Sequence, residues 1–408
     1  MNIKSSKLLV IYLLAISTCM VSAETKTDAK KKVEHWITIG ADSLPGLQEH
    51  FGTLMKKMDV RDGIAVMKLR EEDRNALSDH MHEKHHRCGG FIVHDSYEDA
   101  KQTLNGIRKR KWIRQHQFLD YSIDQDEIVL PMLSDVDEDK IAQVINHLSS
   151  YHNRYYKSQS GVESSKWIGE KWFSLTNGRS DVSLEMVDHP RFPQQSVILT
   201  IKGSSETDEI IVIGGHADSI AGYWGGSKNH APGADDNASG IATMTEIIRV
   251  AMTHDYKPYK TVQFMAYAAE EVGLVGSNLI AKKYKQENKH VVGVIQLDMT
   301  NYKGSDEYDI VMMDDYTNAA QNQFLGQLID HYVKVPWGYS RCGYACSDHA
   351  SWSKNGYPAS MPHEATMQDG NPHIHTTRDT IDKSDDNGEH AANFAKLGLA
   401  YMVELAKQ

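Results

Sequence analysis

The pattern of apolar and polar positions along most of the chain predicts an α/β fold. Short, mostly apolar runs typical of strands occur at residues 195–202, 210–215, 261–267, 291–297 and 309–313. Apolar residues recur at helical spacing at residues 137–155, 163–174, 238–253, 273–286, 317–333, 348–355 and 390–406. Strands that alternate with helices predict a mostly parallel, mixed sheet with helices on both faces.

A smaller α/β pattern precedes this domain. It contains expected strands at residues 35–39, 63–69 and 90–93 and expected helices at 44–58 and 71–83. The basic run at residues 108–111 then leads into a stretch of low periodicity, typical of an exposed linker that proteases cut. We therefore expect a propeptide at residues 24–128 and a catalytic domain at 129–408. An ordinary solvated linker is the alternative.

The first 23 residues predict a secretory signal peptide. Lys4 and Lys7 precede an apolar run at residues 8–20, and small residues at 21–23 form a cleavage site. The apolar run is shorter than the roughly 20 residues that span a bilayer. We expect an exported protein without a membrane anchor, either secreted from the cell or retained in the periplasm.

Charge and cysteine content argue against a nucleic-acid-binding protein and against a fold held together by disulfides. The 408 residues include 44 Lys and Arg against 55 Asp and Glu, a net charge of −11. Because binding to a phosphate backbone needs clustered positive charge, a nucleic-acid partner is disfavoured. The four cysteines are too few for a disulfide scaffold, so a hydrophobic core must hold the fold together.

Acidic and histidine side chains follow the predicted strands at the points where they end. The carboxyl ends of parallel strands meet at one edge of a sheet, so these side chains should lie together. Carboxylates and imidazoles in one place predict a divalent metal site. The alternative is a set of unrelated helix caps and surface groups, and Asp236 could cap the helix that follows it. The set comprises His216, Asp218, Asp236, Glu270, Glu271, Asp298 and His375.

Five motifs in a fixed order resemble a known enzyme family. They are HAD at residues 216–218, GADDNASG at 233–240, AEEVG at 269–273, LDMT at 297–300 and IHTT at 374–377. From about Leu130 to the C-terminus, the chain resembles the secreted co-catalytic two-zinc aminopeptidases of the bacterial leucyl aminopeptidase type.

The resemblance implies a site with two zinc ions per chain. Asp236 would bridge the ions, His216 and Asp298 would complete one, and Glu271 and His375 would complete the other. Glu270 would be the general base that takes a proton from the attacking water. Asp218 would accept the second N–H of the His216 imidazole and so orient that ring.

The resemblance also implies a disulfide between Cys342 and Cys346 beside an apolar substrate pocket. An exported chain favours pairing of these two cysteines, although two reduced thiols are an alternative. His363, Met367 and Gly370 stand where relatives carry aromatic residues, so we expect a preference for large apolar or aromatic residues rather than for leucine alone. The expected substrate-binding residues are Met299, Met313, Tyr344, Ser347, Met361, His363, Met367 and Ile374.

A second group of histidines lies in the small N-terminal unit. His80, His82, His85, His86 and Cys88 are close in sequence, but no carboxylate or thiolate partner completes a recognisable metal site. We therefore expect a solvated, histidine-rich surface there.

The function expected from these features is that of a zymogen of a monomeric, zinc-dependent aminopeptidase. Its substrates would be peptides with a free, preferably apolar, N-terminal residue, and its own propeptide would act as an inhibitor or folding aid. The alternatives are a zinc transferase similar to glutaminyl cyclases and a catalytically silent ectodomain of the same fold. The segment between Asp298 and His375 is too short for the dimerisation domain that related carboxypeptidases and deacylases insert.

Overall fold

The computed structural model describes residues 33–52, 59–61, 63–85, 87, 89–109, 118–119, 121–222 and 226–408. Residues Glu34–Gln408 form one compact unit. The predicted signal peptide lies outside the described residues, as do His86 and Cys88. Among the helices that are described, none combines the length and the apolar character needed to cross a bilayer.

A six-stranded mixed sheet forms the centre of the larger part of this unit. Its strand order is β12-β9-β7-β8-β6-β5, in which β12, β9, β7 and β8 run parallel and β6 and β5 are antiparallel to their neighbours. The strands are β5 Val182–His189, β6 Phe192–Ile201, β7 Glu209–His216, β8 Thr261–Tyr267, β9 His290–Gln296 and β12 Ala359–Ser360. The predicted mixed sheet is confirmed.

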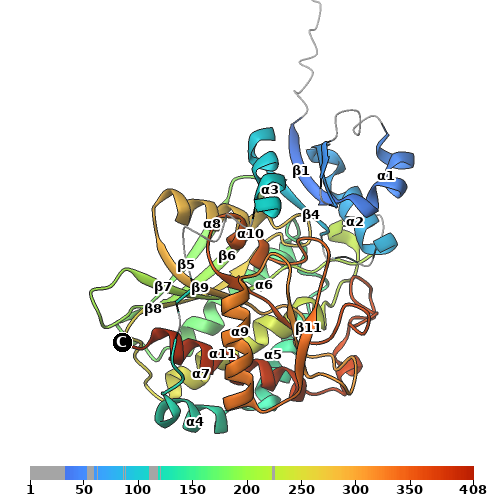
Figure 1. Cartoon of the computed structure of the whole chain (residues 1–408). Coiled ribbons are helices and arrows are strands. Elements are labelled where there is room, and N and C mark those ends of the chain that lie inside the picture. The colour runs from blue at the N-terminus through green and yellow to red at the C-terminus, as the bar shows by residue number, and fades with distance from the viewer. Residues whose placement is uncertain are drawn as a thin grey trace, which may run out of the picture. The chain divides into compact units, whose positions relative to one another are not determined.

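Helices cover both faces of this sheet. In β7, Ile211 and Ile213 pack into the same core cluster as residues of the helices on one face. The alternate residues Ile210 and Val212 pack with residues of the helices on the other face. In Figure 1, α8 and α10 lie above the strands and α7 and α11 below them. The first face carries α5 Glu138–Ser149, α6 Gln159–Ser174, α7 Gly240–Thr253 and α11 Glu389–Ala406, and the second carries α8 Val275–Gln286 and α10 His349–Lys354.

Some elements were not expected from the sequence. β5 lies at the edge of the sheet, where its inner residues are exposed or only partly buried, and it lacks the apolar run that marks the central strands. A second sheet pairs the predicted strand β10 Ile310–Met313 with β11 Trp337–Ser340 and β13 Pro362–His363, and these partners are distant in sequence. The helical segment before β11 divides into α9 Ala319–Leu328 and the π-helical turn Ile329–Val333.

The expected linker is partly helical. α3 Tyr97–Lys109 includes the first basic residues, and α4 Asp126–Ser134 occupies its end, with Val129, Met132 and Leu133 buried. The backbone N–H groups of Asp124 and Gln125 donate to the Glu404 carboxylate of α11 at 3.1 and 3.0 Å. The predicted boundary between residues 128 and 129 therefore falls inside a helix that packs on the catalytic core, and it stays a prediction.

The small N-terminal part is an antiparallel four-stranded sheet with helices. Its strand order is β2-β3-β1-β4. The elements are β1 Glu34–Gly40, α1 Leu44–Phe51, β2 Asp59–Arg61, β3 Ile64–Arg70, α2 Arg74–His85, β4 Phe91–His94 and α3. β1, β3, β4, α1 and α2 correspond to elements expected from the sequence, whereas β2 and α3 were not expected.

An apolar cluster joins the N-terminal part to the loop after β8. Met81, Phe91 and Val93 belong to the same buried cluster as Val272 and Val275. At Gly273, where φ is +107°, an added Cβ would lie 2.7 Å from the Phe91 ring. The close approach of the two segments therefore needs glycine at this position.

A buried arginine holds the end of β7 against the loop that precedes α7. The Arg154 guanidinium donates to the carbonyl oxygens of Ala217 at 3.1 Å, Pro232 at 2.5 Å and Gly233 at 2.8 Å. Its side chain is completely buried, and burial lowers its pKa to about 10. One side chain thus fixes two segments that carry predicted site residues.

Replacing this arginine should destabilise the fold. Arg154→Met leaves buried carbonyl groups without donors, so we expect the free energy of unfolding to fall by about 3–5 kcal/mol. Urea denaturation measures the change. Arg154→Lys keeps a positive charge and three N–H donors, so its free energy of unfolding should fall less than that of Arg154→Met. An unchanged unfolding midpoint for Arg154→Met would show that these hydrogen bonds do not support the loop.

Candidate metal centre and substrate pocket

The predicted acidic and histidine residues meet at the carboxyl ends of the parallel strands. His216 ends β7, Glu270 and Glu271 lie in the loop after β8, and Asp298 follows β9. Two loops bring in the others, one before α7 and one near the C-terminus. All of these side chains are buried, including those of Asp236 and His375.

Asp236 lies between two groups of side chains. Its Oδ1 atom is 3.0 Å from His216 Nε2, and its Oδ2 atom is 2.8 Å from His375 Nε2. His216 Nε2 is also 3.3 Å from Asp298 Oδ1, and His375 Nε2 is 3.4 Å from Glu271 Oε2. One carboxylate therefore contacts both imidazoles.

These atoms fit a divalent metal. Ligands about 2.0–2.2 Å from a tetrahedral zinc ion lie roughly 3.3–3.5 Å from one another, close to the separations here. The ring nitrogens His216 Nε2 and His375 Nε2 and both Glu271 oxygens are buried and make no hydrogen bond with any residue that the structure describes. Burial alone would lower the pKa of His375, but the carboxylates of Glu271 and Asp236 raise it to about 10. The site therefore attracts positive charge.

Glu270 differs from its neighbour Glu271. Both of its carboxylate oxygens are buried without a hydrogen-bond partner among the described residues. Burial raises its pKa well above the usual range. A buried carboxylate of this kind, next to candidate metal ligands, is suited to accept a proton.

The structure places the Asp218 side chain differently from the prediction. His216 Nδ1 is 3.1 Å from the backbone carbonyl oxygen of Asp218 and 3.6 Å from its carboxylate. That carboxylate accepts the backbone N–H groups of Glu270 at 3.0 Å and Glu271 at 3.2 Å. The carbonyl is the nearer acceptor for His216, and the carboxylate positions the two glutamates.

Two further residues support the site, Asp379 and Asn237, of which Asp379 was not predicted to do so. Asp379 accepts the backbone N–H groups of Asp235 and Asp236, each at 3.1 Å. Burial and the neighbouring Asp235 raise the pKa of Asp379 to about 8. Asn237 donates to the Leu297 carbonyl at 3.0 Å and accepts the Met299 N–H at 3.2 Å. The only signal in the sequence that could have indicated this role of Asp379 is its position four residues after His375.

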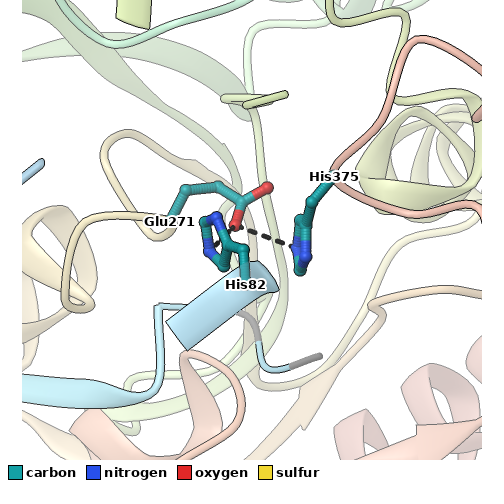
Figure 2. A group of neighbouring side chains, drawn as sticks. All are labelled: His82, Glu271 and His375. Carbon is teal, nitrogen blue, oxygen red and sulfur yellow. Dashed lines mark ion pairs between the residues drawn. The ribbon is translucent and has the colours of Figure 1, made fainter. Parts of the chain in front are cut away.

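The expectation of a solvated histidine surface is wrong for His80 and His82, which are both buried, and His82 also reaches the candidate site. Its side chain is buried, and Nε2 is 3.3 Å from Glu271 Oε2. Its ring stacks on that of His375, with the centroids 3.9 Å apart. Figure 2 shows both rings next to the Glu271 carboxylate. Ligand atoms of His82, Glu271 and His375 lie within 4.8 Å of one another. The carboxylate partner that was missing near His82 in sequence is supplied by a distant segment. Burial lowers the pKa of His82.

A cavity of about 270 Å³ lies beside Asp298. The expected residues that line it are Met299, Tyr344, Met361, His363, Met367 and Ile374. Two expectations differ from the structure. Met313 packs with Tyr344 and Met361 in a buried cluster and is not among the lining residues. Ser347 donates to Asp298 Oδ2 at 2.5 Å, so it orients this carboxylate instead of lining the cavity.

The predicted disulfide is present. Cys342 and Cys346 are bonded, and both line the cavity. The short bridge closes the loop that carries Tyr344.

Similarity to known proteins agrees with this geometry. Residues 196–400 match peptidase family M28. A probable leucine aminopeptidase of Trichophyton verrucosum is 36% identical over 294 residues, which cover 70% of this chain and 77% of that protein.

Two solved structures from Legionella pneumophila are similar over most of the chain. LapB is 32% identical with a TM-score of 0.77, covering 92% of this chain and 100% of LapB. The LapA aminopeptidase is 29% identical with a TM-score of 0.76, covering 92% of this chain and 99% of LapA. Together with the buried cluster of carboxylates and imidazoles, these similarities lead to one conclusion: the chain belongs to peptidase family M28 and is a metal-dependent aminopeptidase.

Proposed function

We propose that the protein is an exported two-zinc aminopeptidase that removes large apolar residues from peptides with a free N-terminus. The observation that carries the proposal is the position of Asp236, whose two oxygens face two separate imidazoles. The family and its aminopeptidase relatives favour this activity over a glutaminyl-cyclase-like transferase or a silent ectodomain.

Each ion would have three protein ligands. His216, Asp236 and Asp298 would hold one, and Asp236, Glu271 and His375 would hold the other. When bound, the two zinc ions supply Lewis acidity that lowers the pKa of water and polarises a peptide carbonyl.

Glu270 would perform the proton transfers. Its carboxylate accepts a proton from the attacking water and returns it to the amine that leaves. The Asp218 carboxylate holds the backbone of Glu270 and Glu271, so one glutamate can face a metal while its neighbour faces the reacting water.

The lining of the cavity supports a preference for apolar side chains. Methionine side chains are flexible and adapt to ligands of different shape. Gly370 leaves room at the cavity wall, because the nearest atom to an added Cβ is 3.7 Å away. The cavity would therefore accept an aromatic side chain as readily as leucine.

Replacing the proposed base should abolish turnover while leaving the metal in place. For Glu270→Gln in the processed enzyme, we expect kcat to fall about 100- to 10,000-fold, because the amide cannot accept the proton. Release of amino acids from unblocked aminoacyl amides and zinc content by elemental analysis are measured together. Zinc should stay near two per chain.

The N-acetylated forms of the same substrates serve as the control, and wild-type enzyme should leave them uncut. Removal of metal by a chelator should stop hydrolysis of the unblocked substrates. Equal hydrolysis of acetylated and free substrates would reject the aminopeptidase assignment, and a fully active Glu270→Gln variant would reject Glu270 as the base.

A large side chain at position 370 should narrow the cavity. We expect Gly370→Phe to lower kcat/KM for phenylalanyl relative to alanyl substrates by about tenfold or more, because the aromatic ring occupies the space of the substrate side chain. Gly370→Ala is the matched control and should change the ratio little. An equal fall for both substrates would argue against this cavity as the specificity pocket.

Export and processing are the remaining parts of the proposal. We propose that residues 1–23 direct export and that the N-terminal domain is removed by cleavage within the basic segment 110–117. Phe118 and the buried residues of α4 pack in the core of the catalytic part, so we place the cut before Phe118 instead of at the boundary expected between residues 128 and 129. N-terminal sequencing of the exported protein checks this, and a mature chain that begins at Glu24 would disprove removal.

A further inference from the structure

Asp315 lies where the second sheet meets the substrate cavity. It follows β10 by two residues, and β10 pairs in parallel with β11, so the segments that follow the two strands meet at the same end of this sheet. The backbone N–H of Asp314 donates to the Ser340 carbonyl oxygen at 3.1 Å and continues this pairing. The loop at residues 341–346, which carries part of the cavity wall, therefore starts beside Asp315.

The Asp315 carboxylate holds the backbone of that loop. Its Oδ1 atom accepts the N–H of Cys342 at 3.2 Å, and its Oδ2 atom accepts the N–H of Gly343 at 2.6 Å. Gly343 has a φ of +80°, a conformation that favours glycine. Successive N–H groups at such a turn form a concave site for an anion, and hydrogen bonds to a charged acceptor are stronger than those between neutral groups. One carboxylate thus fixes the turn.

Two other carboxylates of the protein hold loops in the same way. Asp218 accepts the N–H groups of Glu270 and Glu271, and Asp379 accepts those of two successive residues before α7. Both of those loops carry proposed metal ligands. The loop that Asp315 holds carries residues of the substrate cavity instead, so the same device acts here on substrate binding.

The place of Tyr344 depends on this loop. Its side chain is almost completely buried, and it lines the cavity together with both cysteines of the disulfide. It also packs with Met313 and Met361 in one apolar cluster. A shift of the loop backbone would therefore move an aromatic ring at the cavity wall.

The N-terminal domain supports the same loop from another side. The Arg87 guanidinium lies over the ring of Tyr344, 4.8 Å from its centroid. Ile92 packs in one apolar cluster with Ala345. Removal of that domain, as proposed above, would take both contacts away. The hydrogen bonds to Asp315 lie within the catalytic part and would stay, so the processed enzyme would depend on them more strongly.

We propose that Asp315 is a positioning residue that sets the shape of the substrate cavity and thereby the preference for large N-terminal residues. It is not among the described residues that line the cavity, and it acts through the loop that carries Tyr344. The inference rests on the proposed aminopeptidase function and on the assignment of this cavity to the first side chain of the substrate.

Substitution of Asp315 in the active, zinc-loaded enzyme tests the proposal. For Asp315→Ala we expect kcat/KM for phenylalanyl relative to alanyl amides to fall about tenfold or more, because a loosened wall encloses a large side chain poorly and a small one hardly needs it. The fall should appear as a higher KM for the phenylalanyl amide, with kcat and zinc content close to those of wild type. Asp315→Asn keeps one acceptor oxygen and should show a smaller fall.

Asp314→Asn is the matched control. Asp314 is the neighbouring carboxylate, and it pairs with the Arg341 side chain at 2.7 and 2.8 Å. An exposed ion pair of this kind contributes little, so the substrate ratio should stay that of wild type. Gly343→Ala disturbs the same turn through its positive φ and should lower the ratio as Asp315→Ala does.

The outcomes separate this inference from the proposed function. A wild-type ratio in Asp315→Ala, or an equal fall in kcat/KM for both substrates, overturns the inference while the aminopeptidase function stands. A fall in Asp314→Asn as large as that in Asp315→Ala would attribute the effect to lost charge and would also overturn it. If Asp315→Ala does not fold, the ratios of Asp315→Asn and Gly343→Ala decide in its place. A wild-type enzyme that releases no amino acid from either amide would reject the proposed function and the inference with it.

Discussion

The whole arrangement depends on the cost of burying negative charge at the carboxyl end of the central sheet. Asp236, Glu270, Glu271 and Asp298 are all buried there. An uncompensated buried carboxylate costs several kcal/mol, so each needs hydrogen-bond donors, a proton or a cation. The features around the site can be understood as different ways of meeting that requirement.

Backbone donors and protonation compensate the carboxylates that do not face the proposed ions. Asp218 and Asp379 each accept two backbone N–H groups, and through these they position the loops that carry the proposed metal ligands. Burial and the nearby Asp235 raise the pKa of Glu364 well above its usual range, which favours a neutral acid that can share a proton with Asp235. These residues shape the site without touching the proposed metal.

A buried cation and the imidazoles compensate the rest. Arg154 donates its hydrogen bonds to backbone carbonyl oxygens, and its positive charge lies near the carboxylates of Asp379 and Asp236. His216 and His375 face the two oxygens of Asp236, and divalent ions held by these residues would supply further positive charge. The same demand explains how a third imidazole, from the N-terminal domain, can be accommodated at the Glu271 carboxylate.

The central strands and the polar residues that end them could be predicted because both are local properties. An apolar run such as residues 210–215 specifies a buried strand, and His216 follows it in the chain whatever the rest of the molecule does. The order of the motifs then indicated which of these residues belong together. The edge strand β5 and the short strands β11 and β13 escaped prediction, because their stability comes from pairing with distant segments.

Three-dimensional packing was needed wherever a residue acts through a partner far away in sequence. Asp379 could not be recognised, since its role consists of accepting backbone N–H groups more than 140 positions earlier. Met313 has the composition of a pocket residue, but packing buries it in a cluster that the cavity does not reach. His82 looked solvated because its carboxylate partner is Glu271, and only the docking of α2 against the loop after β8 brings the two together. Sequence order determines which side chains are available at each strand end. The packing of separate segments decides which carboxylates and which imidazoles or N–H donors come into contact, because their interactions depend on distances that the sequence does not fix.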